Sequence, residues 1–199
     1  AGKFRVPDAA EIAMATSLDS GITVITLAPE CVPAGTIRAL VARGAIVCAG
    51  HSAASYEEVR GGLAAGITGF THLYNAMTPL QGREPGVVGA ALEDADSWVG
   101  VIVDGVHVHP ASLKVAIAAK PQGKVLLVTD AMPMVGGATP SFDLYGETIT
   151  ATPCACSACR WMKPAGWRRS TRPSSLAWAA NGGGSRPAIA PTWYCWMPG

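Results

Sequence analysis

The sequence predicts an α/β fold in which parallel strands alternate with helices, and the expected architecture is a partial (β/α)8 barrel. Three observations support this: short apolar runs recur through residues 1–150, helix-like segments separate most of them, and a polar residue follows each run. Runs of this length and composition are typical of strands buried in a parallel sheet. The expected strands are Ile22–Leu27, Ala45–Ala49, Gly69–Leu73, Trp98–Val103 and Val125–Val128.

Three segments between these runs have the features of helices. Each is followed by a stop signal, which is either a glycine just beyond the last turn or a proline soon after it. The spacing from one strand to the next leaves room for a crossover helix, as parallel pairing requires. The expected helices are Ala34–Ala42, Tyr56–Ala65 and Ala111–Ala119.

The polar residues that follow the strands favour a barrel over a doubly wound sheet. In a (β/α)8 barrel the carboxyl ends of all the strands converge on one face, where enzymes of this fold carry out their chemistry. Five strands are too few to close a ring of eight, so we expect about strands 4 to 8 of a barrel. The polar residues are Glu30, His51, His72, Asn75, Asp104, His107 and Asp130.

The composition changes abruptly near residue 150. All 14 Asp and Glu residues lie at or before Glu147, so residues 151–199 have no acidic side chain, whereas they hold five of the six Trp and four of the six Cys. The sequence therefore predicts two regions. Residues 1–150 are expected to form the partial barrel, and residues 151–199 a non-native or disordered tail.

Charge and hydropathy exclude several classes of partner. The net charge is +1 and residues 1–150 contain no basic run, which gives no indication of nucleic-acid binding. No stretch of membrane-spanning length is uninterrupted by polar residues, and the first residues do not have the pattern of a secretory signal. We expect a cytoplasmic protein that binds a small molecule and neither nucleic acid nor membrane.

His51 and His72 follow adjacent strands, 21 residues apart. Because neighbouring parallel strands end at the same edge of a sheet, the two imidazoles are expected side by side, within reach of one divalent ion such as Zn²⁺ or Fe²⁺. A single histidine after a strand is more often a core or loop residue. The repeated placement is what favours a metal site.

Asp130 follows the last predicted strand. A carboxylate beside a bound cation can take a proton from water and later donate it to a leaving amine, which is the acid/base role in metal-assisted hydrolysis. A carboxylate that caps the next turn is an equally good interpretation of its position.

Two further segments add polar groups near the same face. Arg83 offers a planar fork suited to phosphate, although it could also pair with Glu84 or remain solvated. His107 could bind a substrate or only cap a loop. Asn75 supplies a side-chain amide beside the predicted metal ligand His72.

Six ordered blocks together resemble the N-acetylglucosamine-6-phosphate deacetylases of the amidohydrolase superfamily. Six blocks in order and at plausible spacing are far more specific than one short motif. They cover almost all of residues 4–150. The blocks are Thr26–Glu30, Ala49–Ser52, Thr71–Met77, Gly82–Gly86, Asp104–His107 and Val128–Asp130.

The resemblance implies a metal-dependent hydrolase of amino-sugar catabolism that produces acetate and glucosamine 6-phosphate. It implies that His51 and His72 bind the metal and that Asp130 is the catalytic acid/base. It also implies a homodimer in which Arg83 reaches the phosphate bound by the partner subunit. The residues implied to contact the sugar phosphate are Asn75, Ala76, Arg83, Asp104, Gly105, Val106 and His107.

Two features depart from that family's pattern. Its third metal ligand, a glutamate in a His-Leu-Glu-Gly-Pro motif, is absent, and so is a histidine that polarises the carbonyl; both are expected upstream of Ala1, and Glu30 is not assigned in their place. The acid-free tail is explained by a frameshift between about Thr148 and Ala165. We therefore expect the 199-residue chain itself to be inactive.

Two alternatives stay open at this point. The chain could be a non-catalytic fragment that holds its metal weakly. It could also derive from another amidohydrolase, one that cleaves a cyclic amide or an N-acyl amino acid.

Overall fold

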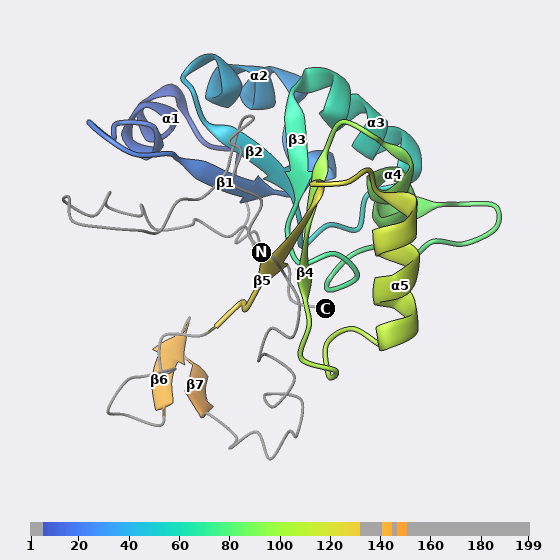
Figure 1. Cartoon of the computed structure of the whole chain (residues 1–199). Coiled ribbons are helices and arrows are strands. Elements are labelled where there is room, and N and C mark those ends of the chain that lie inside the picture. The colour runs from blue at the N-terminus through green and yellow to red at the C-terminus, as the bar shows by residue number, and fades with distance from the viewer. Residues whose placement is uncertain (1–5, 132–140, 145–146, 151–199) are drawn as a thin grey trace.

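The computed structural model describes residues 6–131, 141–144 and 147–150. Five strands form one parallel sheet in the order β1-β2-β3-β4-β5, which is also their order along the chain (Figure 1). The order contains no reversal of the kind that creates the switch point of a doubly wound sheet. The strands are β1 (Val24–Leu27), β2 (Ile46–Ala49), β3 (Ile67–Phe70), β4 (Trp98–Ile102) and β5 (Val125–Val128).

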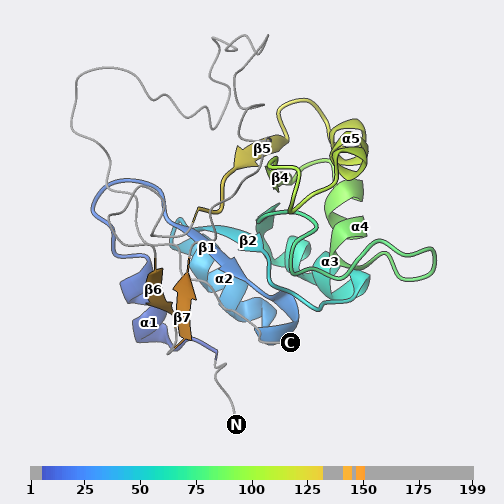
Figure 2. The ribbon, with the colours of Figure 1, turned by 90° about the horizontal axis from the view of Figure 1, so that it is seen from below.

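Helices alternate with these strands and lie along one side of the sheet (Figures 1 and 2). The predicted helices at residues 34–42 and 56–65 are confirmed with these bounds, and the third begins one residue earlier than predicted. Two α-helices, α1 and α4, were not predicted. The helical elements are α1 (Ala9–Ala15), η1 (Pro29–Cys31), α2 (Ala34–Ala42), α3 (Tyr56–Ala65), α4 (Gly86–Glu93) and α5 (Pro110–Ala119).

The third strand differs from its prediction. It was expected at Gly69–Leu73 but runs from Ile67 to Phe70. His72 has a positive φ of 35°, which extended backbone does not adopt, so the strand cannot continue through it. Leu73 is nevertheless fully buried, so buried apolar residues continue beyond the end of β3.

The hydrophobic core lies between the sheet and the helices. Phe70 and Val99 on adjacent strands are paired in register and fully buried, and Val59 and Val87 bring α3 and α4 onto the same core. The last strand is less covered, since Leu127 is 66% exposed. Burial thus falls from the middle of the sheet towards β5.

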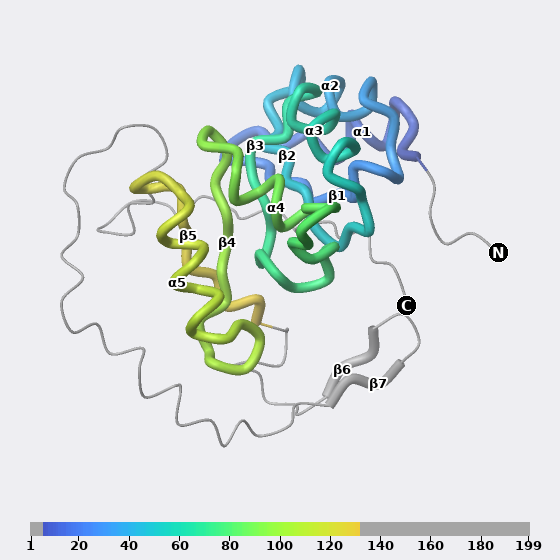
Figure 3. The backbone as a smooth tube through the Cα atoms, turned by 90° about the vertical axis from the view of Figure 1, so that its right-hand side faces the viewer, coloured from blue at the N-terminus to red at the C-terminus, as the bar shows by residue number. Residues whose placement is uncertain are grey.

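The helices are also joined by polar contacts. Arg43, the C-cap residue of α2, donates from Nε to the Thr16 hydroxyl at the end of α1, 2.7 Å away. Figure 3 shows α1 beside α2 at one end of the layer, with α5 beside β4 and β5 at the other.

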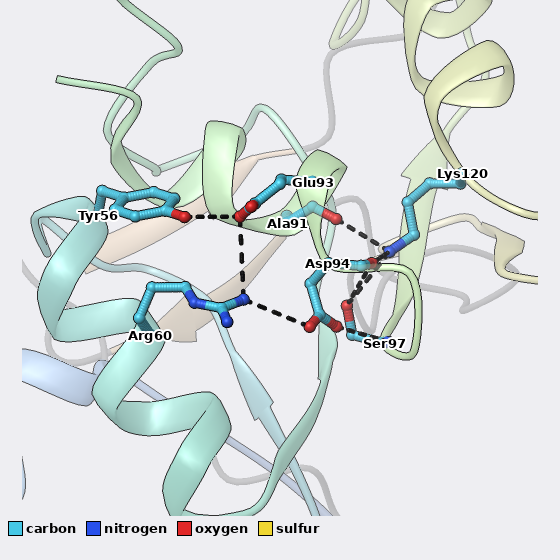
Figure 4. A network of polar contacts seen from close by, with 7 residues as sticks. All are labelled: Tyr56, Arg60, Ala91, Glu93, Asp94, Ser97 and Lys120. Atoms are coloured by element: carbon cyan, nitrogen blue, oxygen red, sulfur yellow. Dashed lines mark hydrogen bonds and ion pairs between the residues drawn. The ribbon is translucent and has the colours of Figure 1, made fainter. Parts of the chain in front are cut away.

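A second set of contacts, shown in Figure 4, connects α3, α4 and α5. Lys120, at the C-cap of α5 and only 5% exposed, donates to the carbonyl oxygens of Ala91 and Asp94 and to the Ser97 hydroxyl. Arg60 of α3 lies 3.6 Å from the Asp94 carboxylate. Because a buried ammonium needs several acceptors, this arrangement stabilises the end of α4.

Residues 141–144 and 147–150 form an antiparallel pair, β6 (Ser141–Leu144) and β7 (Glu147–Thr150). The predicted tail at 151–199 and its frameshift lie outside the described residues. Among the residues that are described, no helix is both long and apolar enough to cross a lipid bilayer.

Candidate functional site

The candidate site lies at the carboxyl ends of the strands. Four predicted site residues each lie two residues beyond a strand residue that is paired in register. Ala49 pairs in register with Phe70, and Ile102 pairs with Val128. His51 and His72 follow the first pair by two residues each, and Asp104 and Asp130 follow the second pair in the same way. Sheet register therefore places four predicted site residues in equivalent positions at one edge.

Three of these four residues have a left-handed backbone. The φ angles are 49° for His51, 35° for His72 and 49° for Asp130. An L-residue in this conformation costs roughly 1–2 kcal/mol, and such strain clusters at functional sites. The surrounding contacts must therefore hold these three residues in place.

The two imidazoles face each other. Nε2 of His72 lies 2.8 Å from Nε2 of His51, and the rings are nearly perpendicular at 86°. His72 is 2% exposed, and its Nδ1 has no hydrogen-bond partner among the described residues. Two neutral imidazoles cannot both direct a lone pair along this line, so the pair requires either one shared proton or a cation.

The spacing fits a metal ion with a small adjustment. Two nitrogens bound to one tetrahedral Zn²⁺ are about 3.3 Å apart when each metal–nitrogen distance is about 2.0 Å. The observed separation is 2.8 Å, so the rings would have to move apart slightly. Imidazole nitrogens suit Zn²⁺ and Fe²⁺, which agrees with the predicted ligand pair.

The environment favours the neutral, ligand form of His51. Burial lowers the pKa of His51, and the charge of His72 lowers it further, whereas the charge of Asp130 raises it. Asp130 follows β5, three strands from β2, and its carboxylate is nevertheless within electrostatic range of His51. These three predicted residues are thus gathered at one place.

A third ligand is not found among the described residues. No group of three or more His, Cys, Asp and Glu side chains in residues 6–131 could hold a metal ion. Catalytic zinc sites usually have three protein ligands and an open position. Among the described residues, the histidine pair therefore has no third His, Cys, Asp or Glu side chain placed to complete a metal site.

The residues after His72 mainly support the loops. The Asn75 side chain donates to the His72 carbonyl 3.2 Å away, and the Ala76 carbonyl accepts from the Ser52 amide at 2.9 Å. Ala76 itself has a φ of 48°. These bonds join the loop that carries His72 to the loop that carries His51, and the predicted roles of Asn75 and Ala76 in sugar binding stay predictions.

Asp104 and His107 form a carboxylate–imidazole pair. His107 Nδ1 lies 2.5 Å from one Asp104 oxygen, and the other oxygen accepts from the backbone amides of Val106 and His107. Burial would raise the pKa of Asp104, but these hydrogen bonds outweigh it and lower the pKa to about 2. Asp104 therefore orients His107, with Gly105 at a φ of 75° closing the turn.

Arg83 lies apart from this cluster. It is exposed, in the segment between β3 and α4 that protrudes beyond the helices in Figures 1 and 2. Among the described residues no ion pair joins Glu84 to Arg83, and one oxygen of the Glu84 carboxylate accepts from the backbone amides of Tyr56 and Gly86. Arg83 is thus available to a ligand or a partner, as the predicted role requires.

An apolar hollow lies apart from these residues. It has a volume of about 290 Å³, and none of the predicted site residues lines it. Tyr74, Leu80 and Val115 are among its walls, between the β3–α4 segment and α5. The candidate chemistry therefore resides at the strand ends and not in this hollow.

Sequence reasoning missed the residues that shape the backbone before His51. A Cβ on Gly50 would lie 2.8 Å from Thr26 Cγ2 and 3.1 Å from Thr71 Cβ, so only glycine fits. The hydroxyls of Thr26 and Thr71 are hydrogen-bonded to each other at 2.8 Å across Gly50. A glycine directly before His51, at the end of a predicted strand, was the sequence feature that could have indicated this close packing.

A parallel sheet that gathers titratable side chains from successive strands at its carboxyl edge defines the class: an α/β protein with an enzyme-type site. Comparison with known proteins narrows this class. The chain is 48% identical over 131 residues to an N-acetylgalactosamine-6-phosphate deacetylase of Shewanella sp. (strain ANA-3), covering 66% of the chain and 33% of that protein. It is 44% identical over 121 residues to the human N-acetylglucosamine-6-phosphate deacetylase, covering 58% of the chain and 29% of that protein.

Solved structures give the same result. The N-acetylglucosamine-6-phosphate deacetylase of Pasteurella multocida matches with a TM-score of 0.67 and 37% identity, over 75% of this chain and 39% of that one. A D267A mutant of the Mycobacterium smegmatis enzyme, in complex with N-acetyl-D-glucosamine-6-phosphate, matches with a TM-score of 0.65 and 33% identity, over 75% and 40%. No protein-family model matches the sequence.

Over its matched residues the chain is similar to N-acetylglucosamine and N-acetylgalactosamine 6-phosphate deacetylases. The predicted resemblance is confirmed. The chain spans about a third of the length of the curated relatives, 33% of the Shewanella protein and 29% of the human one.

Proposed function

We propose that the described residues form part of the site of an amidohydrolase that removes the acetyl group from an N-acetylhexosamine 6-phosphate. The substrate that we favour is N-acetylglucosamine 6-phosphate. The observation that carries the proposal is the pair of facing imidazoles at the carboxyl ends of β2 and β3, within the electrostatic range of Asp130. We further propose that the five strands are part of a (β/α)8 barrel and that the intact enzyme is a homodimer.

In this proposal His51 and His72 hold a divalent ion through Nε2. The ion would supply Lewis-acid polarisation of the acetamide carbonyl. Asp130 would take a proton on a carboxylate oxygen from the attacking water and then pass it to the departing amine nitrogen, which releases acetate and the amino sugar. Its exposure and its electrostatic effect on His51 support this role.

The phosphate would be bound by side chains at the rim. His107 is oriented by Asp104, and its ring is exposed, so it can present Nε2 to a ligand. Arg83 would supply a bidentate fork from the protruding segment to the partner subunit's substrate. Asn75, Ala76, Gly105 and Val106 would line the sugar between these groups.

The identity of the amino sugar, glucosamine or galactosamine, is a separate part of the proposal. The chain is 48% identical to the Shewanella galactosamine enzyme and 44% identical to the human glucosamine enzyme. N-acetylgalactosamine 6-phosphate, which differs from the favoured substrate only at C4, is therefore the second candidate.

The test is calorimetric binding of both 6-phosphates to the 199-residue chain in the presence of Zn²⁺, with unphosphorylated N-acetylglucosamine and an N-acyl amino acid as comparisons. We expect binding that requires the phosphate and is lost in His107→Ala. Equal binding of the unphosphorylated sugar, or preference for the N-acyl amino acid, would favour another amidohydrolase.

Acetate release is measured in the same samples. We expect little turnover, because the described residues supply only two of the three protein ligands that catalytic zinc sites use. Turnover at an ordinary enzymatic rate would contradict the predicted inactivity of this chain. A chain that binds none of the four compounds would support the non-catalytic alternative.

A further inference from the structure

The backbone of His51 needs support from its neighbours. His51 has a φ of 49°, and the residue before it, Gly50, donates its amide to the Leu27 carbonyl 3.2 Å away. The residue after it, Ser52, is 4% exposed and donates its amide to Ala76. These two bonds fix the chain on both sides of His51, but neither fixes the turn that follows.

Glu30 supplies the missing support. It lies in η1, directly after β1, and both of its carboxylate oxygens are used: one accepts from the Ser52 hydroxyl at 2.7 Å, the other from the Ala53 amide at 2.6 Å. The Ser52 hydroxyl in turn accepts from the Ala54 amide at 3.1 Å. The Glu30 carboxylate, which follows β1, therefore holds the turn that follows β2. We call these bonds of Glu30 to Ser52 and Ala53 the clamp.

Hydrogen bonds of Ser52 connect the clamp to the loop that carries His72. Ser52 contacts Glu30 through its side chain and Ala76 through its backbone, so one buried residue joins the ends of β1, β2 and β3. His72 lies in the loop that contains Ala76, and the Asn75 side chain bonds back to the His72 carbonyl.

We propose that Glu30 is a positioning residue of the candidate metal site, which holds the turn after His51 so that His51 Nε2 faces His72 Nε2. It is not proposed as a ligand, because no group of three His, Cys, Asp and Glu side chains that could hold a metal ion occurs among the described residues, so Glu30 does not complete the histidine pair. The expected effect of Glu30 on metal affinity rests on the proposed function. Its expected effect on the facing of the two imidazoles does not.

The test uses the full 199-residue chain, with its reactive cysteines alkylated so that thiolates cannot bind the probe. Two readouts are made on the parent and on Glu30→Ala: the ring-to-ring nuclear Overhauser effect between His51 and His72 without metal, and the affinity for Zn²⁺. We expect Glu30→Ala to lose the ring contact and to bind Zn²⁺ roughly 10–100-fold more weakly, as is typical when the support of a metal ligand is removed.

Two further variants separate positioning from general stability. Glu30→Gln can still accept from the Ala53 amide and can donate to the Ser52 hydroxyl, so it is expected to keep the ring contact and to bind Zn²⁺ within about threefold of the parent. Glu58→Ala is the matched control, because Glu58 accepts in the same way from the Ser55 amide and hydroxyl but does not contact residues 51–53.

Glu58→Ala is expected to change neither readout. The proposal is overturned if Glu30→Ala keeps the ring contact, or if Glu58→Ala loses it equally. If Glu30→Ala does not fold, Ser52→Ala removes half of the clamp and must weaken the same two readouts. A parent chain that shows the ring contact without selectivity for sugar phosphates would remove the proposed function and leave this proposal standing.

Discussion

His51 and His72 face each other because each lies two residues beyond one member of a register pair, Ala49 on β2 and Phe70 on β3. The pairing of two buried strands thereby brings both residues to the same edge of the sheet, where their Nε2 atoms are 2.8 Å apart. A shift of one strand by one residue would turn one imidazole away from the other, since side chains alternate along a strand. The candidate site is thus a direct consequence of sheet register.

Gly50→Ala is predicted to disturb this site from one residue away. The added Cβ would meet Thr26 Cγ2 at 2.8 Å and Thr71 Cβ at 3.1 Å, and overpacking of this kind typically costs about 1–3 kcal/mol. Urea denaturation should show that loss. Gly35→Ala is the control, because nothing lies within 4 Å of a Cβ at Gly35, and an equal loss there would contradict the packing argument.

Asp104 is predicted to remain ionised down to about pH 2, below its ordinary pKa of 3.8. Because the folded-state pKa is lowered, the stabilisation from Asp104 is fully present above about pH 4 and is lost as the pH falls through about 2. The carboxyl ¹³C resonance of Asp104 reports the midpoint directly.

His107→Ala should raise that midpoint towards the ordinary value, because it removes the side-chain hydrogen bond to the Asp104 carboxylate. His109→Ala should leave it unchanged, since His109 bonds to the Ala111 amide instead. An Asp104 midpoint near 3.8 in the parent would show that the pair is not formed in solution.

Lys120→Met is predicted to destabilise the fold by about 1–3 kcal/mol, because it leaves buried carbonyl groups at the end of α4 without a donor. Lys120 is 5% exposed and contacts Ala91, Asp94 and Ser97 (Figure 4). Lys114→Met on the exposed side of α5 should change the free energy of unfolding by no more than about 0.5 kcal/mol. Equal effects of the two substitutions in urea denaturation would contradict this account.

The elements that could be predicted are those with local signals. Helix α3 begins with Ser55 and Glu58 bonded reciprocally and ends at Gly66, whose φ is 117°, and both its bounds were predicted correctly. Helix α1 has an equally readable start in Asp8 and Glu11 but was not predicted. Helix α4 has two glycines in eight residues, a composition that argues against a helix, and it is stabilised by burial of nearly its whole length.

The supporting contacts of the site could not be read from sequence, because they join residues far apart in the chain. The pair of histidines was predicted from matching strand ends, which register then confirmed. The bonds of Glu30 to Ser52 and Ala53 span 22 and 23 residues and depend on where a turn places two backbone groups. Spacing predicts which side chains meet, but not what holds them.

The measurement that tests the central claim most directly is Zn²⁺ titration of the cysteine-alkylated chain, followed at the imidazole resonances of His51 and His72. Cys48 does not interfere, because burial raises the pKa of its thiol to about 12. We predict that one Zn²⁺ shifts both histidines together, that His51→Ala or His72→Ala abolishes this binding, and that His109→Ala does not. Zn²⁺ binding that is absent in the parent, or unchanged in both His51→Ala and His72→Ala, would contradict the assignment of this pair as a metal site.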